Sequence, residues 1–195
     1  MAGPLVGIFV GGRSRRMGGR PKGLLPAPDR AGETLVERLA RIAAAALPAS
    51  DIVLVGEAKP YAELGIPALA DDPEGIGPLG GLSALLAEAE RRGAPSAVAL
   101  ACDMPFVSAA LLERLGAFRP DAAAVAPRQD GRWQPLCARY AAAPALAAAR
   151  RVLAGEQRAL FAVLDELGDG AAELPLEDAE LELLRDWDRP EDLSK

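Results

Sequence analysis

A short glycine-rich stretch near the start of this 195-residue chain carries five basic side chains. Its leading glycines and its bases are Gly11, Gly12, Arg13, Arg15, Arg16, Arg20 and Lys22. Because glycine lacks a Cβ atom, backbone N–H groups can approach a phosphate closely there, and the cationic side chains add charge-assisted hydrogen bonds. An apolar run directly precedes the stretch, which favours a phosphate cradle over a solvated basic loop. The pattern therefore predicts binding of a polyphosphate.

The best candidate for a metal ligand is Asp103, which follows a second apolar run at 96–101. A carboxylate at the end of a strand can hold a Mg²⁺ ion that bridges the oxygens of a bound polyphosphate. Taken alone, an aspartate two residues before Pro105 is more typical of a structural turn. Paired with the basic stretch, Asp103 indicates a site for a polyphosphate with its cation.

Two other motif matches are weaker. Lys22 is followed by Gly23 rather than by Ser or Thr, so the basic stretch is not a Walker A loop. Residues 75–80 match the glycine pattern of dinucleotide-binding folds, but residues 71–74 separate them from any strand. Pro78 suits the first turn of a helix. We expect a close-packed turn whose helix faces a base or ribose, with a purely structural turn as the alternative.

Composition excludes several classes of function. The chain has no histidine, which excludes Ser-His-Asp and Cys-His catalysis and His-ligated zinc. Its net charge of −6 disfavours general affinity for nucleic acid or anionic membranes, although residues 1–28 hold five bases and no acid. Two cysteines are too few for a disulfide framework. The cysteines and tryptophans are typical of packed side chains, namely Cys102, Cys137, Trp133 and Trp187.

The spacing of apolar residues predicts strands that alternate with helices. Strands are expected at 4–10, 51–55, 66–70, 96–101, 122–126 and 135–140, with one or two short strands in 172–184. Helices are expected from the capping box at Thr34 to Pro48, at 78–92, 108–115, 144–153 and 157–166, and from Asp188 onward. A long functional loop is expected at 13–30.

This alternation predicts an α/β fold with three α/β/α layers around a Rossmann-like, mainly parallel sheet. The carboxyl ends of parallel strands share one edge of the sheet, so the basic stretch and Asp103 should meet there. The length predicts a single domain spanning residues 1–195. Without an apolar run long enough for a membrane span, or a signal-peptide pattern, we expect a cytoplasmic protein.

Five segments together carry a resemblance to a known family. They are Gly11 to Gly19 with Lys22, Gly77-Pro78-Leu79-Gly80-Gly81-Leu82, Cys102-Asp103-Met104-Pro105-Phe106, Gln134-Pro135-Leu136 and Pro190-Glu191-Asp192-Leu193. In this order they resemble the nucleotidyltransferases of molybdenum-cofactor biosynthesis, and most of all the molybdenum cofactor guanylyltransferases. The resemblance implies a nucleotidyltransferase fold and transfer of GMP from GTP to molybdenum-molybdopterin, which yields the guanine dinucleotide cofactor and pyrophosphate.

The resemblance also implies roles for single residues. Phe9, Val10 and Gly11 would line the guanine and sugar, with Gly12 beside the nucleotide. Lys22, Arg15 and Arg16 would neutralise the triphosphate, and Asp103 would bind Mg²⁺ and nucleotide. Asp71, or Asp72 in its place, would lie near the guanosine. The product would pass to molybdoenzymes or to their chaperones.

The sequence departs from the family at two positions. Val55 or Gly56 stands where the family often has an asparagine on the second strand, and an asparagine common near Asp188 is missing. The pair Gly11-Gly12 resembles guanylyl enzymes, since cytidylyl relatives tend to have alanine before the final glycine.

Three alternatives stay open on sequence alone. The first is a nucleotidyltransferase with another substrate, either a molybdopterin cytidylyltransferase or a sugar-phosphate enzyme. The second is a dehydrogenase that binds its dinucleotide at residues 75–80. The third is a binding module that delivers cofactor to a partner without catalysis.

Overall fold

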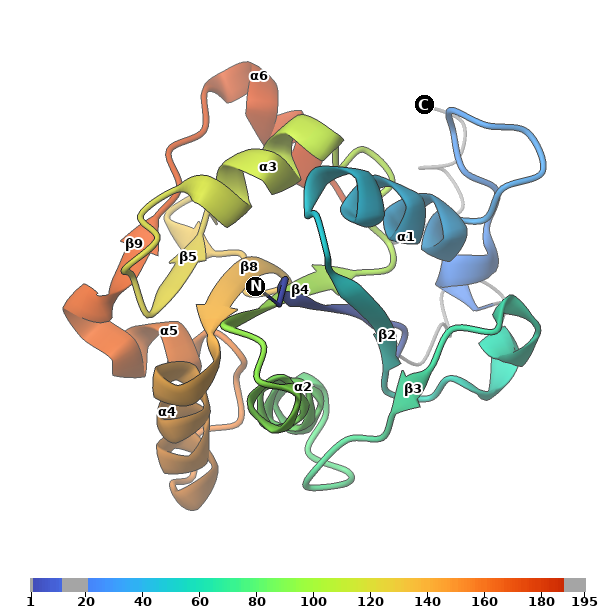
Figure 1. Ribbon diagram of the computed structural model, residues 1–195. Coiled ribbons are helices and arrows are strands. Elements are labelled where there is room, and N and C mark those ends of the chain that lie inside the picture. The colour runs from blue at the N-terminus through green and yellow to red at the C-terminus, as the bar shows by residue number, and fades with distance from the viewer. Residues whose placement is uncertain (1, 12–20, 188–195) are drawn as a thin grey trace.

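A computed structural model describes residues 2–11 and 21–187 of the chain. Its main sheet has seven strands in the order β3-β2-β1-β4-β8-β5-β9 (Figure 1). Their bounds are β1 Leu5–Phe9, β2 Asp51–Val55, β3 Ala68–Leu69, β4 Ser96–Ala101, β5 Ala124–Ala126, β8 Cys137–Ala141 and β9 Ala171–Glu173. All neighbouring pairs are parallel except the two that involve β8. A separate hairpin joins β6 Arg128–Gln129 and β7 Arg132–Trp133.

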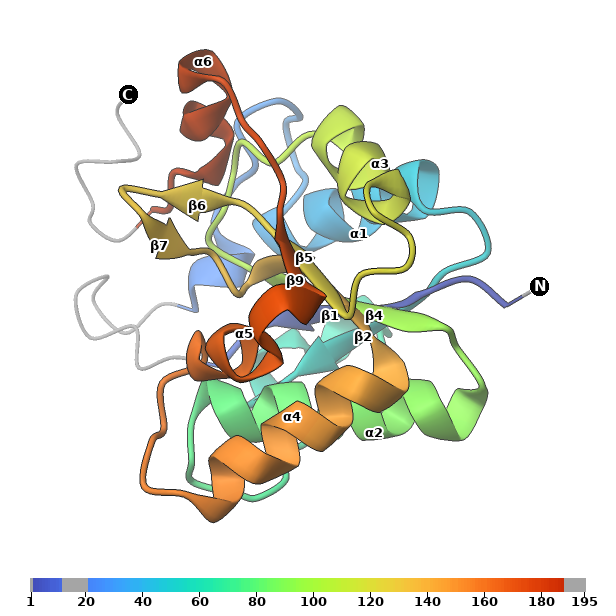
Figure 2. The same ribbon diagram turned by 90° about the vertical axis from the view of Figure 1, so that its left-hand side faces the viewer.

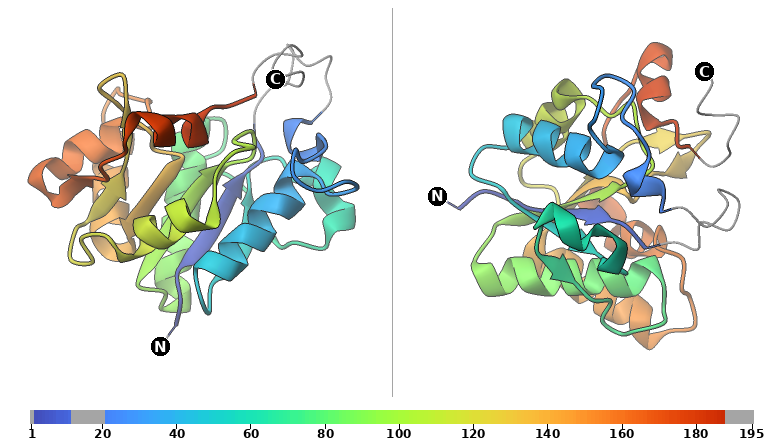
Figure 3. Two further views of the ribbon diagram at one scale, coloured as in Figure 1. Left: turned by 90° about the horizontal axis from the view of Figure 1, so that it is seen from above. Right: turned by 90° about the vertical axis from the view of Figure 1, so that its right-hand side faces the viewer.

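Helices cover both faces of the sheet, as Figures 1 and 3 show. One face carries α1 Leu35–Ala46 and α3 Ala109–Ala117, and the other carries α2 Pro78–Arg92, α4 Ala142–Ala154 and α5 Ala162–Leu167. The remaining helical turns are α6 Asp178–Leu181 and the 3₁₀ turns η2 Lys22–Leu24, η3 Lys59–Leu64, η4 Gly168–Gly170 and η5 Glu182–Leu184. The predicted three-layer α/β/α arrangement with a mainly parallel sheet is confirmed.

Local signals set several of these boundaries. Thr34 and Glu37 form the predicted capping box, in which each side chain bonds the other's backbone N–H. Gly93 ends α2 in the left-handed conformation at φ 69°, and Ser108 caps α3 through the Leu111 N–H. These helices therefore begin and end close to where the residue pattern places them.

Two predicted elements differ in the structure. The helix expected at 157–166 begins only at Ala162, because the Gln157 amide oxygen accepts the N–H groups of Arg158 and Ala159 and holds a turn there. In 172–184 only the start is a strand. A capping box between Glu177 and Glu180 then begins α6, so of the one or two short strands expected in 172–184 the structure has one, β9. The helix predicted from Asp188 lies outside the described residues.

The core is aliphatic, and it divides into one apolar cluster on each side of the sheet. One cluster joins the sheet to α2, α4 and α5, and the other joins it to α1 and α3. Every residue of β1 is buried, as expected for a central strand covered on both faces. Within the described residues, no helix combines the length and apolar character needed to cross a membrane.

The central strand β1 packs so closely on α2 that one position has no space for a side chain. A Cβ atom on Gly7 would lie 2.6 Å from Cδ2 of Leu85 and 3.0 Å from Cγ2 of Val55. We predict that Gly7→Ala destabilises the protein by about 1–3 kcal/mol because these buried side chains must shift. Urea unfolding measures the change. Gly155→Ala, at a glycine with φ −87° and only ordinary contacts, should stay within about 0.5 kcal/mol of wild type, and equal effects of both variants would contradict the prediction.

Candidate active site

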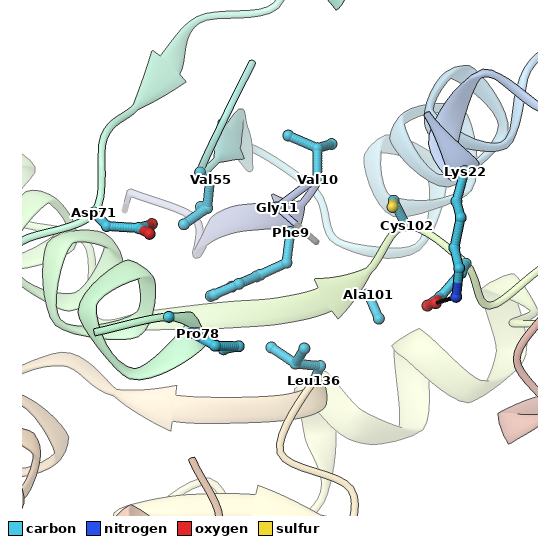
Figure 4. Close-up of a pocket in the computed structure, with 13 residues that line it drawn as sticks. Phe9, Val10, Gly11, Lys22, Val55, Asp71, Pro78, Ala101, Cys102 and Leu136 are labelled. Carbon is cyan, nitrogen blue, oxygen red and sulfur yellow. Dashed lines mark hydrogen bonds and ion pairs between the residues drawn. The ribbon is translucent and has the colours of Figure 1, made fainter. Parts of the chain in front are cut away.

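A cavity of about 330 Å³ opens at the edge of the sheet where β1, β2 and β4 end. Its lining residues are Phe9, Val10, Gly11, Lys22, Val55, Gly56, Asp71, Gly77, Pro78, Ala101, Cys102, Asp103 and Leu136. The volume lies in the range of small-molecule sites, and the position is where open α/β sheets bind ligands. Figure 4 shows Asp71 at one end of the cavity and Lys22 at the other, with apolar side chains between them.

The two charged groups predicted to meet do so at one end of the cavity. Lys22 Nζ donates a hydrogen bond to Asp103 Oδ2 at 2.8 Å, and both side chains keep about a fifth of their surface exposed. Lys22 begins η2 directly after Pro21, and the Leu25 N–H closes that turn on the Lys22 carbonyl at 3.0 Å. Asp103 follows β4, whose end is tied to β1 by a 3.1 Å bond from the Cys102 N–H to the Phe9 carbonyl.

Part of the predicted phosphate cradle cannot be placed. Gly12, Arg13, Arg15, Arg16 and Arg20 lie outside the described residues. Of the basic stretch, Gly11 and Lys22 are described, and both line the cavity.

Apolar groups form the middle of the cavity. Phe9 and Val10 at the end of β1 are less than a tenth exposed, and Leu136 faces them from the turn before β8 (Figure 4). At the position where the family resemblance suggests an asparagine, Val55 is buried and Gly56 adopts φ 99°. Neither residue offers a polar side chain, so any such base contact must come from elsewhere.

Asp71 supplies the polar group at the other end. The sequence does not distinguish it from Asp72, but in the structure Asp71 lines the cavity and Asp72 is exposed. Within the described chain no side-chain or backbone group bonds its carboxylate. Partial burial, together with the nearby Glu74 charge, raises the pKa of Asp71 above its usual value. A carboxylate whose charged form is destabilised in this way, and which lines a cavity, is typical of a group that binds a ligand.

Glycines at the start of α2 leave room for the segment that carries Asp71 to pack against this helix. Gly77 precedes the helix at φ 78°, and Pro78 takes its first position, so the predicted turn opening a helix is confirmed. A Cβ atom on Gly80 would lie 2.3 Å from the Pro73 carbonyl oxygen, and one on Gly81 would lie 3.1 Å from Asp71 Oδ1. The strand context of a dinucleotide fingerprint is missing, since β3 ends at Leu69.

The remaining candidates from the sequence are packed side chains. Burial raises the pKa of both the Cys102 and Cys137 thiols to about 12, which keeps them neutral and unreactive at pH 7. Trp133 stacks against the Arg128 guanidinium, 3.7 Å from the ring centroid, and Trp187 is buried. Among the described residues no three potential ligands of the types His, Cys, Asp and Glu gather to hold a metal by themselves.

Sequence reasoning did not identify every apolar residue of the lining. Ala101 carries no chemical signature, and its only signal was its place at the end of a predicted strand. Val55, Pro78 and Leu136 lie at positions that the family resemblance pointed to, but no role as an apolar wall was predicted for them.

Comparison with known proteins identifies the family. The family model described as MobA-like NTP transferase domain matches residues 6–169, which is most of the chain. The chain belongs to the MobA-like NTP transferase family. One relative of this MobA-like chain is the probable molybdenum cofactor guanylyltransferase of Opitutus terrae, 36% identical over 95% of this chain and 90% of that protein.

Two further similarities agree with this assignment. The probable molybdenum cofactor guanylyltransferase of Mycobacterium tuberculosis is 38% identical over 70% of this chain and 68% of its own length. The solved structure of molybdopterin-guanine dinucleotide biosynthesis protein A from Archaeoglobus fulgidus superposes with a TM-score of 0.73. It is 27% identical and covers 97% of this chain and 95% of that one.

The raised pKa of Asp71 leads to a prediction about stability. An acid whose pKa is higher in the folded than in the unfolded state stabilises the fold below its unfolded pKa, and this contribution is lost as pH rises through the folded pKa. Asp71→Asn should therefore be more stable than wild type at pH 7, and the difference should shrink as pH falls toward about 4. Urea unfolding across this range measures it. Asp72→Asn, which makes the same change at an exposed neighbour, is the control variant, and a less stable Asp71→Asn at pH 7 would refute the assignment.

Proposed function

We propose that this MobA-like NTP transferase moves GMP from GTP to molybdenum-molybdopterin, which gives the guanine dinucleotide cofactor and releases pyrophosphate. One observation carries the proposal. A single cavity joins an apolar base-sized region ending in Asp71 to the Lys22–Asp103 pair, in a chain 36% identical to a protein named probable molybdenum cofactor guanylyltransferase. The arrangement suits a nucleotide with its base at one end and its phosphates at the other.

Asp71 favours guanine over the other bases. A carboxylate accepts hydrogen bonds, and guanine offers the adjacent N1–H and N2–H₂ donors on one edge. Adenine and cytosine pair a single amino group with a ring nitrogen acceptor, which repels a carboxylate oxygen. The apolar walls of Phe9 and Leu136 would cover the faces of the ring, and their low dielectric would strengthen this selection.

At the other end, Lys22 would neutralise phosphate charge, with Arg15 and Arg16 of the basic stretch proposed in the same role. Asp103 fits a divalent cation. Its carboxylate accepts the Lys22 hydrogen bond on Oδ2, and a carboxylate has about four acceptor positions, so coordination capacity is left over. Mg²⁺ characteristically uses one or two carboxylates plus substrate phosphates, which matches Asp103 as the one carboxylate among the described residues at this end of the cavity.

The chemistry follows from these charges. A phosphate oxygen of molybdenum-molybdopterin forms a bond to the α-phosphorus of GTP, while the bond from that phosphorus to the bridging oxygen of the β-phosphate breaks. The electron pair leaves with pyrophosphate. The attacking phosphate is already ionised, so the chain needs no general base, and a sequence without histidine can support the reaction. A bound Mg²⁺ would supply polarisation of the phosphoryl oxygens, and Lys22 would offset the charge on the departing group.

The decisive experiment is a nucleotide panel. We expect pyrophosphate release with GTP, molybdenum-molybdopterin and Mg²⁺ together, and none when the pterin is left out. ATP, CTP and UTP at equal concentration should give less than about a tenth of the GTP rate, because one mismatched hydrogen-bond set costs on the order of 1–3 kcal/mol. A preference for CTP would indicate a cytidylyltransferase, and GTP binding without turnover would indicate a delivery module. Either result refutes the proposal.

Removing either charge of the pair should impair turnover. Lys22→Ala and Asp103→Ala should each lower kcat/KM on the order of 10²-fold or more, since each removes charge stabilisation of the transferring phosphoryl group. Lys59→Ala and Asp72→Ala remove the same two side-chain types at exposed positions, and as controls they should keep kcat/KM near the wild-type value. A near wild-type rate for Asp103→Ala would end its proposed role.

A further inference from the structure

The last described residues return to the candidate site from the far end of the chain. After η5 the backbone N–H of Trp187 donates to the carbonyl of Asp103 at 2.9 Å. Figure 2 shows this end of the described chain on the side to which the β6–β7 hairpin projects. The residue proposed to bind the cation is thus held through its own backbone by a segment that no motif in the sequence singled out.

The Trp187 ring is packed rather than free. It is 6% exposed and forms a small apolar cluster with Leu25, Ala27 and Leu35, separate from the two main cores. Phe106 packs against this cluster with its ring 6.0 Å from that of Trp187 at an interplanar angle of 87°. This edge-to-face geometry is the favoured one for aromatic pairs. We call these residues the Trp187 cluster.

The Trp187 cluster lies where the segments of both charged residues meet. Leu25 closes the turn that begins with Lys22, through its N–H bond to the Lys22 carbonyl at 3.0 Å. Phe106 follows Asp103 by three residues on the loop after β4. The indole of Trp187 thus pairs with Phe106 on the loop of Asp103 and shares one apolar cluster with Leu25, which closes the turn of Lys22.

Hydrogen bonds hold the backbone both before and after the Cα atom of Asp103. Before it, the Cys102 N–H bonds the Phe9 carbonyl at 3.1 Å, and after its Cα atom its own carbonyl accepts the Trp187 N–H. The first bond holds the peptide between Ala101 and Cys102, one residue before Asp103, and the second holds the peptide that directly follows Asp103, so together they restrict the direction of the Asp103 Cα–Cβ bond. The 2.8 Å contact between Lys22 and Asp103 depends on that direction.

We propose that Trp187 is a positioning residue, which sets the placement of the Asp103 carboxylate relative to Lys22 and thereby the affinity of the site for a divalent cation with a nucleoside triphosphate. This inference rests on the proposed function for its ligand class. It concerns the phosphate end of the cavity and holds whichever base is bound at the Asp71 end. Trp187 itself touches neither substrate nor cation in this proposal.

The test compares two buried residues of the same C-terminal segment. Leu184 is 4% exposed and belongs to the core cluster under α1 and α3 rather than to the Trp187 cluster, so Leu184→Ala destabilises the protein while the ring pair of Trp187 and Phe106 keeps both its members. Binding of Mn²⁺ in the presence of a non-hydrolysable GTP analogue is measured by titration calorimetry for full-length wild type, Trp187→Ala and Leu184→Ala. Thermal unfolding is recorded alongside.

We expect Trp187→Ala to weaken Mn²⁺ binding about tenfold or more, and to raise the Mg²⁺ concentration for half-maximal turnover by a similar factor. Leu184→Ala should stay within about twofold of wild type in both measurements despite its lower unfolding temperature. Trp187→Phe keeps an aromatic edge and should recover most of the affinity, and Trp187→Leu takes the place of the alanine variant if that variant does not fold. Unchanged Mn²⁺ binding in the Trp187 variants, or an equal loss in Leu184→Ala, would overturn the proposal.

This experiment separates the two claims. If wild type releases no pyrophosphate from GTP but binds another triphosphate, the proposed function fails, and the Mn²⁺ titration with an analogue of that triphosphate still decides the role of Trp187. If wild type turns over GTP and the Trp187 variants bind Mn²⁺ normally, only the positioning role fails.

Discussion

The contact between Lys22 and Asp103 is the constraint on which the site depends, because it joins two loops that the chain reaches by separate routes. An ion pair that keeps a fifth of each side chain exposed adds little to stability, of the order of 1 kcal/mol or less. Its value is therefore not in holding the fold together. The parallel pairing of β1 with β4 brings the two loops to one edge, where the ion pair leaves each charge compensated; in the proposed function an anion and a cation would take the place of the two partners.

Much of the candidate site at this edge of the sheet could be predicted from the sequence, because the residue patterns that indicate it are local. An apolar run that ends in glycines predicts a buried strand and a backbone-rich loop, and two such strand ends must share an edge if the strands are parallel. Lys22, Asp103 and Gly11 were predicted in this way, whereas the role of Phe9 was implied by the family resemblance, and all four residues line the cavity. The turn before α2 was also predictable, since Pro at a first helical position is a local preference.

What could not be predicted depends on contacts between distant parts of the chain. Asp71 and Asp72 are chemically identical neighbours, and only the packing of their segment on Gly80 and Gly81 turns one of them into the cavity. Trp187 reaches the Asp103 loop through a hydrogen bond that no local pattern encodes. Of the one or two short strands expected in 172–184 only β9 forms, because the side chains of Glu177 and Glu180 cap a helical turn after it.

The reversed direction of β8 has a consequence for how such an enzyme can diversify. Leu136 enters the cavity from the start of β8, since that antiparallel strand begins at the edge where its parallel neighbours end, and the Ala101 N–H bonds the Leu136 carbonyl there at 2.9 Å. The hairpin of β6 and β7 immediately precedes this point and makes its own separate two-stranded sheet. A longer hairpin, or one with other side chains, would leave the register of the seven-stranded sheet intact. The part of the cavity wall next to Leu136 can thus change in sequence independently of β1, β2 and β4, at whose ends Phe9, Val55 and Ala101 line the same cavity.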